Sequence, residues 1–396
     1  MSGEVLAGKK TLATPPTSDQ LEVSVFGPGV GESILVHAGR GQWICVDSAK
    51  YQDRPWALYY LRQMDLDPAK NIRLIVASHW HSDHVDRLSD VVSECRNATF
   101  ACSRALRTDE FKRIIARYLL EDTDKIKAPL KEMQSIFNAW HARRSLDRNC
   151  PAPRLAAARN LLDDFEWRRR RFLFWQRRYR VEIWSLSPSP ADELEAMSEF
   201  AKLFVPVDQV ASGIAPIKHN KASVVILIKA GRDVILLGSD LENYESQQSG
   251  WNAIVGYTLS RNNKSGMFKV PHHGSQGAYS QDVWDVLVTD EAIAVVTPYT
   301  PSGLPRTNEI ARLASQGRAI YATALPREVQ IARANDVHKS IKEATRGTIK
   351  AYMAGDDLGF VRLRKRADER SNWSVELFGS ATKLYGDSAP QWTTPP

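Results

Sequence analysis

One stretch of seven residues, Ser78 to His84, holds an unusual concentration of side chains that bind metal ions. Its sequence is Ser-His-Trp-His-Ser-Asp-His, and it follows the apolar run Ile72 to Ala77, which predicts a buried strand. A tight loop after that strand would hold three imidazoles and a carboxylate, the ligands that Zn²⁺ and similar divalent ions prefer. The alternative is a polar loop that is rich in histidine by chance, in a chain with only 9 histidines. We favour a metal site, because none of these side chains belongs in a core without a partner.

Three later stretches supply further residues of the same kinds, each beside a run with strand character. They contain His219, then Asp240 after the apolar run Val234 to Gly238, and then the pair His272 and His273. Together with the first loop, these stretches resemble the metallo-β-lactamase-fold hydrolase superfamily. Its signature is a His-x-His-x-Asp-His loop followed by a later His, a later Asp and a final His at strand ends.

Within that superfamily, the chain is similar to the competence-type (ComEC-like) nuclease branch. The similarity lies in the stretch Pro271 to Ser275, in the Asn-x-x-Ser pattern from Asn220 to Ser223, and in the N-terminal hairpin. The hairpin of that branch also ends in an aspartate. The resemblance therefore implies that Asp47 is a structural group rather than a metal ligand.

The resemblance implies a four-layer αββα sandwich that holds two metal ions at its edge, Zn²⁺ or, as an alternative, Mn²⁺. By position, the first ion would be held by His79, His81 and His219. Asp83 and His84 match the second site, and Asp240 matches the carboxylate that bridges both ions. Neutral imidazoles around a divalent ion lower the pKa of bound water towards about 7, which supplies hydroxide at neutral pH. Asp83 could both bind metal and orient that hydroxide.

The last ligand comes from His272 or His273. Neighbouring residues in an extended chain point to opposite sides, so one of them should bind metal while the other faces the substrate. The His-x-Gly-Ser/Thr pattern of the superfamily favours His272 as the ligand. His273 is then a candidate proton donor or phosphate contact, and the reverse order stays open. For His219, the alternative interpretation is a surface histidine with no metal.

Bulk properties are those of a soluble globular protein. The chain has 396 residues, of which 43% are hydrophobic and 25% charged, and its net charge of +7 favours polyanionic partners without requiring them. The four cysteines form no Cys-x-x-Cys pair, and no apolar run is long enough to span a membrane. We therefore expect a cytoplasmic protein without disulfides and with no contact to membranes.

The domain organisation follows from the same patterns. We expect a loose tail over residues 1–20, a metallo-β-lactamase-fold domain over 21–388 and a frayed end over 389–396. Residues 103–180 interrupt the minimal fold. Apolar residues at helical spacing between Leu106 and Leu119, between Leu130 and Trp140, and again from Leu155 to Phe165 predict a helical insertion.

A basic and aromatic segment closes this insertion. Its arginines are Arg168, Arg169, Arg170, Arg171, Arg177 and Arg178, interleaved with Phe and Trp. Such a pattern suits phosphate contact combined with base stacking, and it marks these arginines as candidate nucleic-acid contacts. The alternative is a solvated amphipathic face whose aromatic side chains belong to the core.

The favoured function is metal-dependent hydrolysis of a phosphodiester, most plausibly by a nuclease that acts on DNA or RNA. A small-molecule phosphodiesterase or esterase is the first alternative, and it predicts a narrow pocket roofed by the insertion with the arginines turned outward. A second alternative is a subunit that acts only with a regulatory partner, for instance in antiviral defence, or as a homo-oligomer. The fold does not decide among these substrates, and the native metal and the choice of endo or exo action stay open.

Overall fold

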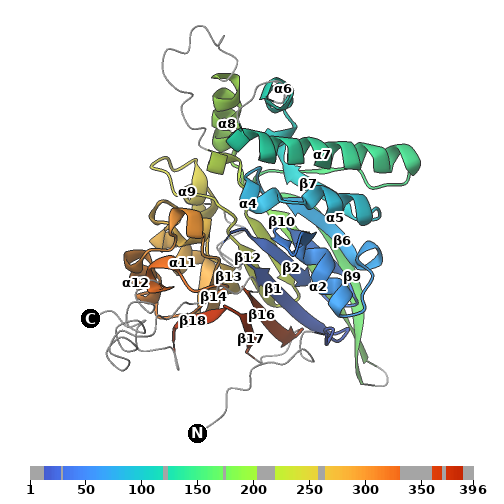
Figure 1. Cartoon of the computed structure of the whole chain (residues 1–396). Helices are drawn as coiled ribbons and strands as arrows, with labels where there is room; N and C mark the ends of the chain where they lie inside the picture. The colour runs from blue at the N-terminus through green and yellow to red at the C-terminus, as the bar shows by residue number, and fades with distance from the viewer. Residues whose placement is uncertain are drawn as a thin grey trace, which may run out of the picture.

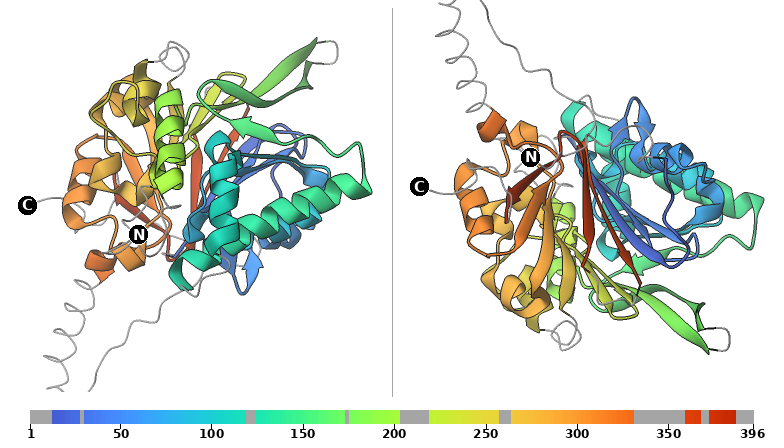
Figure 2. Two further views of the ribbon diagram at one scale, coloured as in Figure 1. Left: turned by 90° about the horizontal axis from the view of Figure 1, so that it is seen from above. Right: turned by 90° about the horizontal axis from the view of Figure 1, so that it is seen from below.

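The computed structural model describes residues 13–27, 30–118, 124–172, 175–202, 219–256, 264–330, 359–367 and 372–386. These residues form two eight-stranded sheets that pack face to face, with helices on the outer face of each (Figures 1 and 2). The arrangement is the four-layer αββα sandwich that the sequence predicts. Of the tail expected over residues 1–20, residues 1–12 lie outside the described residues, and strand β1 begins at Gln20. The end expected to be frayed, residues 389–396, also lies outside the described residues.

The first sheet contains the N-terminal strands and, at one edge, two strands from the last third of the chain. Its spatial order is β17 (Ser374–Gly379), β16 (Gly359–Arg366), β1 (Gln20–Phe26), β2 (Ser33–His37), β3 (Trp43–Val46), β6 (Ile72–Ala77), β7 (Thr99–Ser103) and β8 (Arg154–Ala156). Strands β3 and β6 are parallel, with Val46 opposite Val76, so the loops that follow the two strands leave the sheet at the same edge.

The second sheet is built from the middle and later parts of the chain. Its order is β18 (Thr382–Tyr385), β15 (Ala319–Ala322), β14 (Val288–Val296), β13 (Ser265–Lys269), β12 (Asp233–Leu237), β11 (Ile226–Ala230), β10 (Trp175–Ser185) and β9 (Asn160–Phe172). Strands β12, β13 and β14 are parallel, so the loops after β12 and β13 meet at one edge.

Three apolar layers explain why the sandwich holds together. Leu21, Val23 and Val25 on alternate positions of β1 belong to the layer between the sheets, whereas Phe26 faces the helices of the first sheet. Those helices are α2 (Trp56–Gln63), α5 (Leu88–Glu94), α6 (Asp109–Tyr118) and α7 (Asp124–Leu146). The second sheet is covered by α9 (Gly250–Gly256), α11 (Gln281–Leu287) and α12 (Thr307–Ala314).

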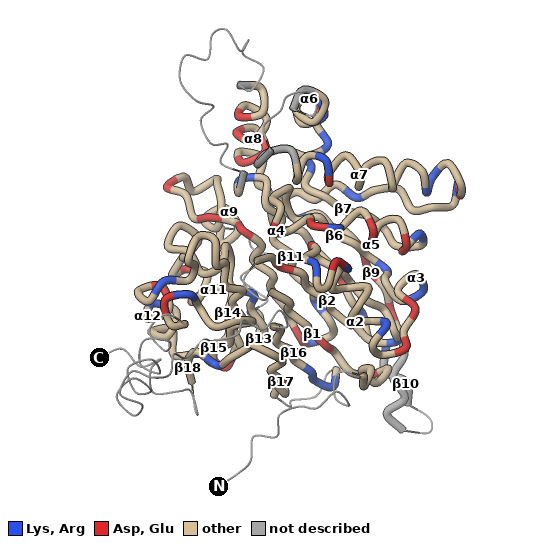
Figure 3. Tube along the Cα trace, viewed as in Figure 1, with Lys and Arg blue, Asp and Glu red and all other residues tan. Residues whose placement is uncertain are grey.

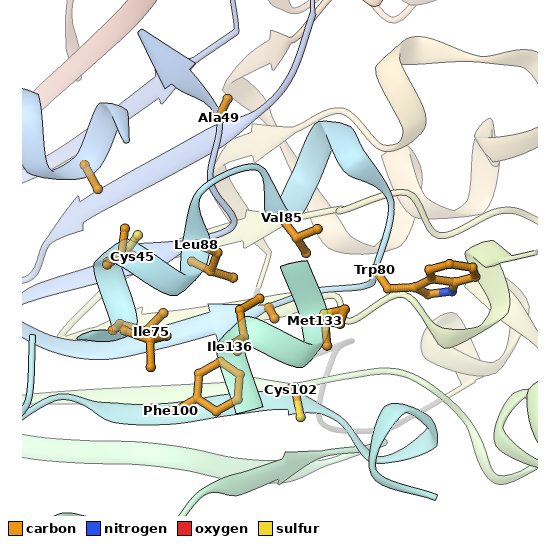
Figure 4. Close-up of a cluster of buried hydrophobic side chains, with 14 of the residues drawn as sticks. Cys45, Ala49, Ile75, Trp80, Val85, Leu88, Phe100, Cys102, Met133 and Ile136 are labelled. Atoms are coloured by element: carbon orange, nitrogen blue, oxygen red, sulfur yellow. The ribbon is translucent and has the colours of Figure 1, made fainter. Parts of the chain in front are cut away.

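The insertion packs directly beneath the histidine-rich loop. Met133 and Ile136 of α7 lie in the same buried cluster as Trp80 and Val85, which flank the metal-binding residues (Figure 4). Helix α6 joins this layer through Phe111, whose ring lies 5.7 Å from that of Trp80. Helices α6 and α7 therefore position the loop as well as covering the sheet.

The third helix expected within the insertion is wrong. Residues from Leu155 to Phe165 form strand β8 and the start of β9, which pairs with β10 in a long antiparallel hairpin. The residues from Asp164 to Trp167 alternate as in a strand, because Phe165 and Trp167 pack on the core while Asp164 and Glu166 are exposed. The buried Leu162 lies at a shift in the strand register, which interrupts this alternation. Trp167 Nε1 donates to the carbonyl of Ala38 at 3.1 Å and so ties the hairpin to the first sheet.

Among the helices of the described residues, none combines the length and the apolar character needed to cross a membrane. All four cysteines are buried and free, as expected for a chain without disulfides.

Truncation of Met133 tests the role of α7 in stability. The side chain is fully buried, so Met133→Ala should lower the free energy of unfolding by about 2–5 kcal/mol. Urea unfolding followed by circular dichroism measures the change. Gln134→Ala alters the exposed neighbour and should change the free energy by less than about 0.5 kcal/mol. Equal effects of the two substitutions would contradict the packing described here.

Candidate metal centre

Loops from both sheets converge at one edge of the sandwich. The histidine-rich loop leaves β6 and enters the short helix α4 (Ser82–Val85), Asp240 follows β12, and His272 and His273 follow β13. The backbone N–H of Val224 donates to the carbonyl of Ser78 at 3.1 Å, which joins the two sheets at this edge. Residues from positions 79 to 273 are brought together in this way.

Two imidazoles and two carboxylates form one cluster. Asp83, His84, Asp240 and His273 each offer one ligand atom, and these atoms lie within 4.8 Å of one another. His273 Nε2 is 3.1 Å from Asp83 Oδ2, and His84 Nε2 is 3.3 Å from Asp240 Oδ1. This set of nitrogen and oxygen donors fits a divalent cation.

A second cluster shares Asp240 with the first. It contains His79, His81 and Asp240, with His79 Nε2 3.1 Å from His81 Nδ1 and 3.7 Å from Asp240 Oδ2. One oxygen of Asp240 thus faces His84 and the other faces His79. The carboxylate lies between the clusters, which is the position of a bridging ligand.

The hydrogen bonds of three imidazoles aim their Nε2 atoms at the centre. His84 Nδ1 donates to Asp47 Oδ2 at 2.8 Å, and His273 Nδ1 donates to the carbonyl of Thr297 at 2.8 Å. His79 Nδ1 lies 3.0 Å from Ser78 Oγ, which itself donates to Asp47 Oδ2. When Nδ1 carries the proton, a neutral imidazole offers the lone pair of Nε2 to a metal.

Two buried atoms of the clusters lack hydrogen bonds. His84 Nε2 and Asp240 Oδ1 face each other at 3.3 Å without forming a hydrogen bond, and neither atom has another hydrogen-bond partner among the described residues, although both are almost fully buried. A buried polar atom without a partner is costly, and a bound cation would satisfy both of these. The residues present therefore fit a divalent metal ion.

Protonation states follow from burial and from the neighbouring charges. Burial lowers the pKa of His79 well below its usual range, and the neighbouring His84 and His81 add to this. Burial opposes ionisation of Asp240, but the charges of His84 and His273 outweigh it and hold its pKa well below the usual range. Burial also opposes charging of His84, but Asp240 and Asp83 raise its pKa well above the usual value. A cation that binds here has to displace the proton of His84.

The order of the two adjacent histidines differs from the expectation. His273, and not His272, lies in the cluster with Asp83, whereas His272 Nδ1 is 3.1 Å from Glu242 Oε1 and its Nε2 is 4.0 Å from Asp240 Oδ2. The two imidazoles do face different partners, as expected of neighbouring residues, but the chain is not extended here, and the His-x-Gly-Ser/Thr pattern favoured the other order. Both histidines have positive φ, 43° and 53°, in the short turn η4 (His272–Gly274).

His219 is placed only through its backbone. It opens the short turn η3 (His219–Ala222), and its side chain lies outside the described residues. The next residue is close to the centre, because Asn220 Nδ2 donates to Glu242 Oε1 at 2.9 Å and lies 3.5 Å from His272 Nδ1.

The candidate nucleic-acid contacts lie away from this edge. Ser185, at the end of β10, pairs with Ile226 near the centre, and Arg178 is seven positions further along the strand, about 20 Å away. Arg178 is exposed and lies 3.8 Å from Glu166. The side chains of Arg168, Arg169, Arg170, Arg171 and Arg177 lie outside the described residues.

Several residues at the centre had no role in the sequence prediction. Glu242 and Thr297 hold His272 and His273, and the Tyr299 ring stacks on His273 with centroids 5.0 Å apart. Glu242 follows Asp240 by two positions, which is a weak local signal. Thr297 and Tyr299 follow β14 and are far from every motif, so no local pattern marks them.

Comparison with known proteins gave matches among solved structures alone. No family model matches the chain, and no curated protein matches it. Several solved structures are similar to the chain, and one of them, YhfI, is described as a metallo-β-lactamase-fold protein. They include YhfI from Bacillus subtilis at 9% identity (TM-score 0.33, 70% of this chain and 86% of that chain). Zn²⁺-bound PqqB from Methylobacterium extorquens has 10% identity (TM-score 0.34, 76% of this chain and 97% of that chain). Human tRNase Z, short form, has 12% identity (TM-score 0.31, 70% of this chain and 92% of that chain).

Metal affinity should rise with pH because the cation displaces a proton. The raised pKa of His84 keeps it protonated at and below neutral pH, so the apparent affinity for Zn²⁺ should increase by up to about tenfold per pH unit until that pKa is passed. Calorimetric titration from pH 6 to 8, in buffers of different ionisation enthalpy, gives the number of protons released. His141→Ala, an exposed histidine on α7, should leave the profile unchanged. An affinity that is independent of pH would contradict this description.

Proposed function

We propose that this chain is a metal-dependent hydrolase that cleaves phosphodiester bonds, with nucleic acid as the favoured substrate class. The observation that carries the proposal is the carboxylate of Asp240 between two groups of donors, with one oxygen towards His84 and the other towards His79. A pair of divalent ions, Zn²⁺ or Mn²⁺, would supply a hydroxide at neutral pH and neutralise charge on the phosphate. The similarity at Pro271 to Ser275 supports a relationship to the competence-type nucleases.

The proposed ligands follow the two clusters. His79, His81 and Asp240 would hold one ion, with His219 as a further ligand, and Asp83, His84, Asp240 and His273 would hold the other. His273 takes the ligand role that the sequence pattern favoured for His272.

His272 then takes the role at the substrate. Its side chain is 23% exposed, and the contact between Nδ1 and Glu242 directs Nε2 towards the open side of the centre. An imidazole held in this way can donate a hydrogen bond to a phosphate oxygen or act as a general acid that protonates the leaving alkoxide. Asn220 donates to Glu242 and helps to fix the orientation of the pair.

The β9–β10 hairpin is the proposed contact for the nucleic-acid backbone. In the strand register Arg169 lies opposite Arg177, and Arg168 lies opposite Arg178. Like charges directly opposite each other destabilise a strand pair, and a bound polyanion would relieve the repulsion. The hairpin lies far from the metal centre, so it would capture the substrate rather than take part in the chemistry.

A small-molecule phosphodiesterase is the second candidate. It is favoured by a cavity of about 520 Å³ beside Asp83, one wall of which is α7 of the insertion. Ligand cavities of about 300–1,000 Å³ are typical of sites for small molecules.

Hydrolysis of bis(p-nitrophenyl) phosphate tests the proposed function. With Zn²⁺ or Mn²⁺ the purified protein should release p-nitrophenol, and Asp240→Asn should lower kcat by at least about 100-fold because it removes the shared carboxylate. His273→Ala should lower metal affinity, whereas His272→Ala should lower kcat with little change in bound metal. Activity that survives Asp240→Asn would come from a contaminant and would defeat the proposal.

Salt dependence tests the hairpin separately. Arg168→Gln combined with Arg169→Gln should weaken binding of duplex DNA and reduce the slope of log Kd against log salt concentration by about 1–2. Fluorescence anisotropy with a labelled duplex measures both effects. Arg144→Gln combined with Arg148→Gln, exposed arginines at the end of α7 and just beyond it, is the matched control. Equal slopes in the two double variants would contradict a DNA contact and would support the alternative that the hairpin arginines form an ordinary solvated surface.

A further inference from the structure

The cavity beside the metal centre is bordered by both halves of the sandwich and by the insertion. It opens against Asp83, and its walls include Lys50 after β3, Asp86 after α4, Pro129 and Glu132 of α7, and Tyr299 after β14. Asp83 is itself in contact with His273, so the cavity begins at the cluster where the reacting phosphate would lie. A substituent of that phosphate has direct access to this space.

The charges on the cavity walls are mostly negative. Beside Asp83, which the proposed ligand set assigns to a metal ion, Asp86 and Glu132 contribute carboxylates, and Lys50, the one cation among the described lining residues, lies 3.8 Å from Asp86. Acidic positions, red in Figure 3, also occur on α5, but no residue of α5 belongs to the described lining of the cavity. Burial raises the pKa of Glu132, whose Oε1 accepts a hydrogen bond from the Ser89 N–H at 2.8 Å. In either protonation state Glu132 offers hydrogen-bonding oxygens, and the positive charge of Lys50 lies beside Asp86. A second phosphate would be repelled here.

The remaining walls suit a flat or cyclic group. The Tyr299 ring lines the cavity and stacks on His273 at an interplanar angle of 21°, so its aromatic surface adjoins the metal cluster. Pro129 and Val85 add apolar surface on the side of α7 and α4. Aromatic and apolar walls with a few acceptor oxygens match an uncharged ring system that carries hydroxyl or amino donors.

We propose that this cavity holds the uncharged, nucleoside-sized substituent on one side of the scissile phosphodiester and rejects a substituent that carries a further phosphate. This inference rests on the proposed function. In the reaction, a P–O bond to the incoming water oxygen forms, a P–O ester bond breaks, and the leaving alkoxide takes up a proton, so a diester and water give a monoester and an alcohol. The enzyme then cuts a terminal linkage of a strand, or the linkage of a small diester, and does not cut between two internal phosphates.

Dinucleoside monophosphates with and without an added terminal phosphate test the proposal. Thymidylyl-thymidine, its 5′-phosphorylated form and its 3′-phosphorylated form are compared by kcat/KM with the metal-loaded protein. One of the two added phosphates should lower kcat/KM at least tenfold, because one end of the molecule lies among the carboxylates. The variant with Glu132→Gln and Asp86→Asn should reduce this discrimination to about threefold or less. Asp90→Asn, an exposed carboxylate of α5 outside the cavity lining, should leave it unchanged.

Binding of a nucleoside to the cavity can be measured without hydrolytic activity. Thymidine, an uncharged nucleoside, should bind the metal-free protein in saturation-transfer NMR. Ala128→Trp places an indole at the mouth of the cavity from an exposed helical position and should abolish the signal, whereas Gln134→Trp should keep it. Thymidine signals that are missing in the wild type, or that survive Ala128→Trp, would overturn the inference, as would equal kcat/KM for all three dinucleotides. Failure of the proposed function is distinct, because it would also abolish hydrolysis of bis(p-nitrophenyl) phosphate.

Discussion

The carboxylate of Asp47 is the contact on which the geometry of the centre depends. It lies at the end of β3 and accepts from the Ser78 backbone N–H at 2.7 Å, from the Ser78 hydroxyl at 2.6 Å and from His84 Nδ1 at 2.8 Å. These bonds connect both ends of the histidine-rich loop to the neighbouring strand. They also fix which nitrogen of His84 faces Asp240. Parallel pairing of β3 and β6 puts Asp47 beside Ser78, so the sheet itself creates this arrangement.

The other half of the centre is held by a buried network between the sheets. Lys269 Nζ lies 2.7 Å from Glu32 Oε2, and the Thr297 hydroxyl donates to the same oxygen at 2.6 Å. Both charged side chains are almost fully buried, and a buried ion pair is costly unless its geometry and its further hydrogen bonds are good. Thr297 in turn accepts from His273, so the network joins the β1–β2 loop to the histidine that completes the cluster. The precision of the site thus depends on contacts between distant parts of the chain.

The sequence predicts those parts of the site whose residues are close together in the chain. The histidine-rich loop, Asp240 and the strands before them are recognisable in the sequence. In each case the apolar run and the metal-binding residues that follow it lie within a few positions of one another. The segment from Leu155 to Phe165, which contains the start of β9, is predicted as a helix because its apolar residues fit both periods, whereas its partner strand β10 lies further along the chain. The order of His272 and His273 depends on two left-handed residues that no side-chain pattern marks. The positions of Thr297 and Tyr299 depend on the parallel pairing of β13 and β14, which sequence alone did not establish.

The net charge of +7 describes the whole surface of the molecule and not its centre. The arginine-rich hairpin lies about 20 Å or more along β10 from the edge where the clusters meet, while the cavity beside Asp83 is lined by carboxylates. A long-range positive field attracts a polyanion from any direction, but at short range the carboxylates decide which part of it can enter. Under the proposed function, affinity for nucleic acid and choice of the scissile bond would therefore depend on separate parts of the fold. The basic composition argues only for the first, and the second would depend on the carboxylates contributed by α7 and α4.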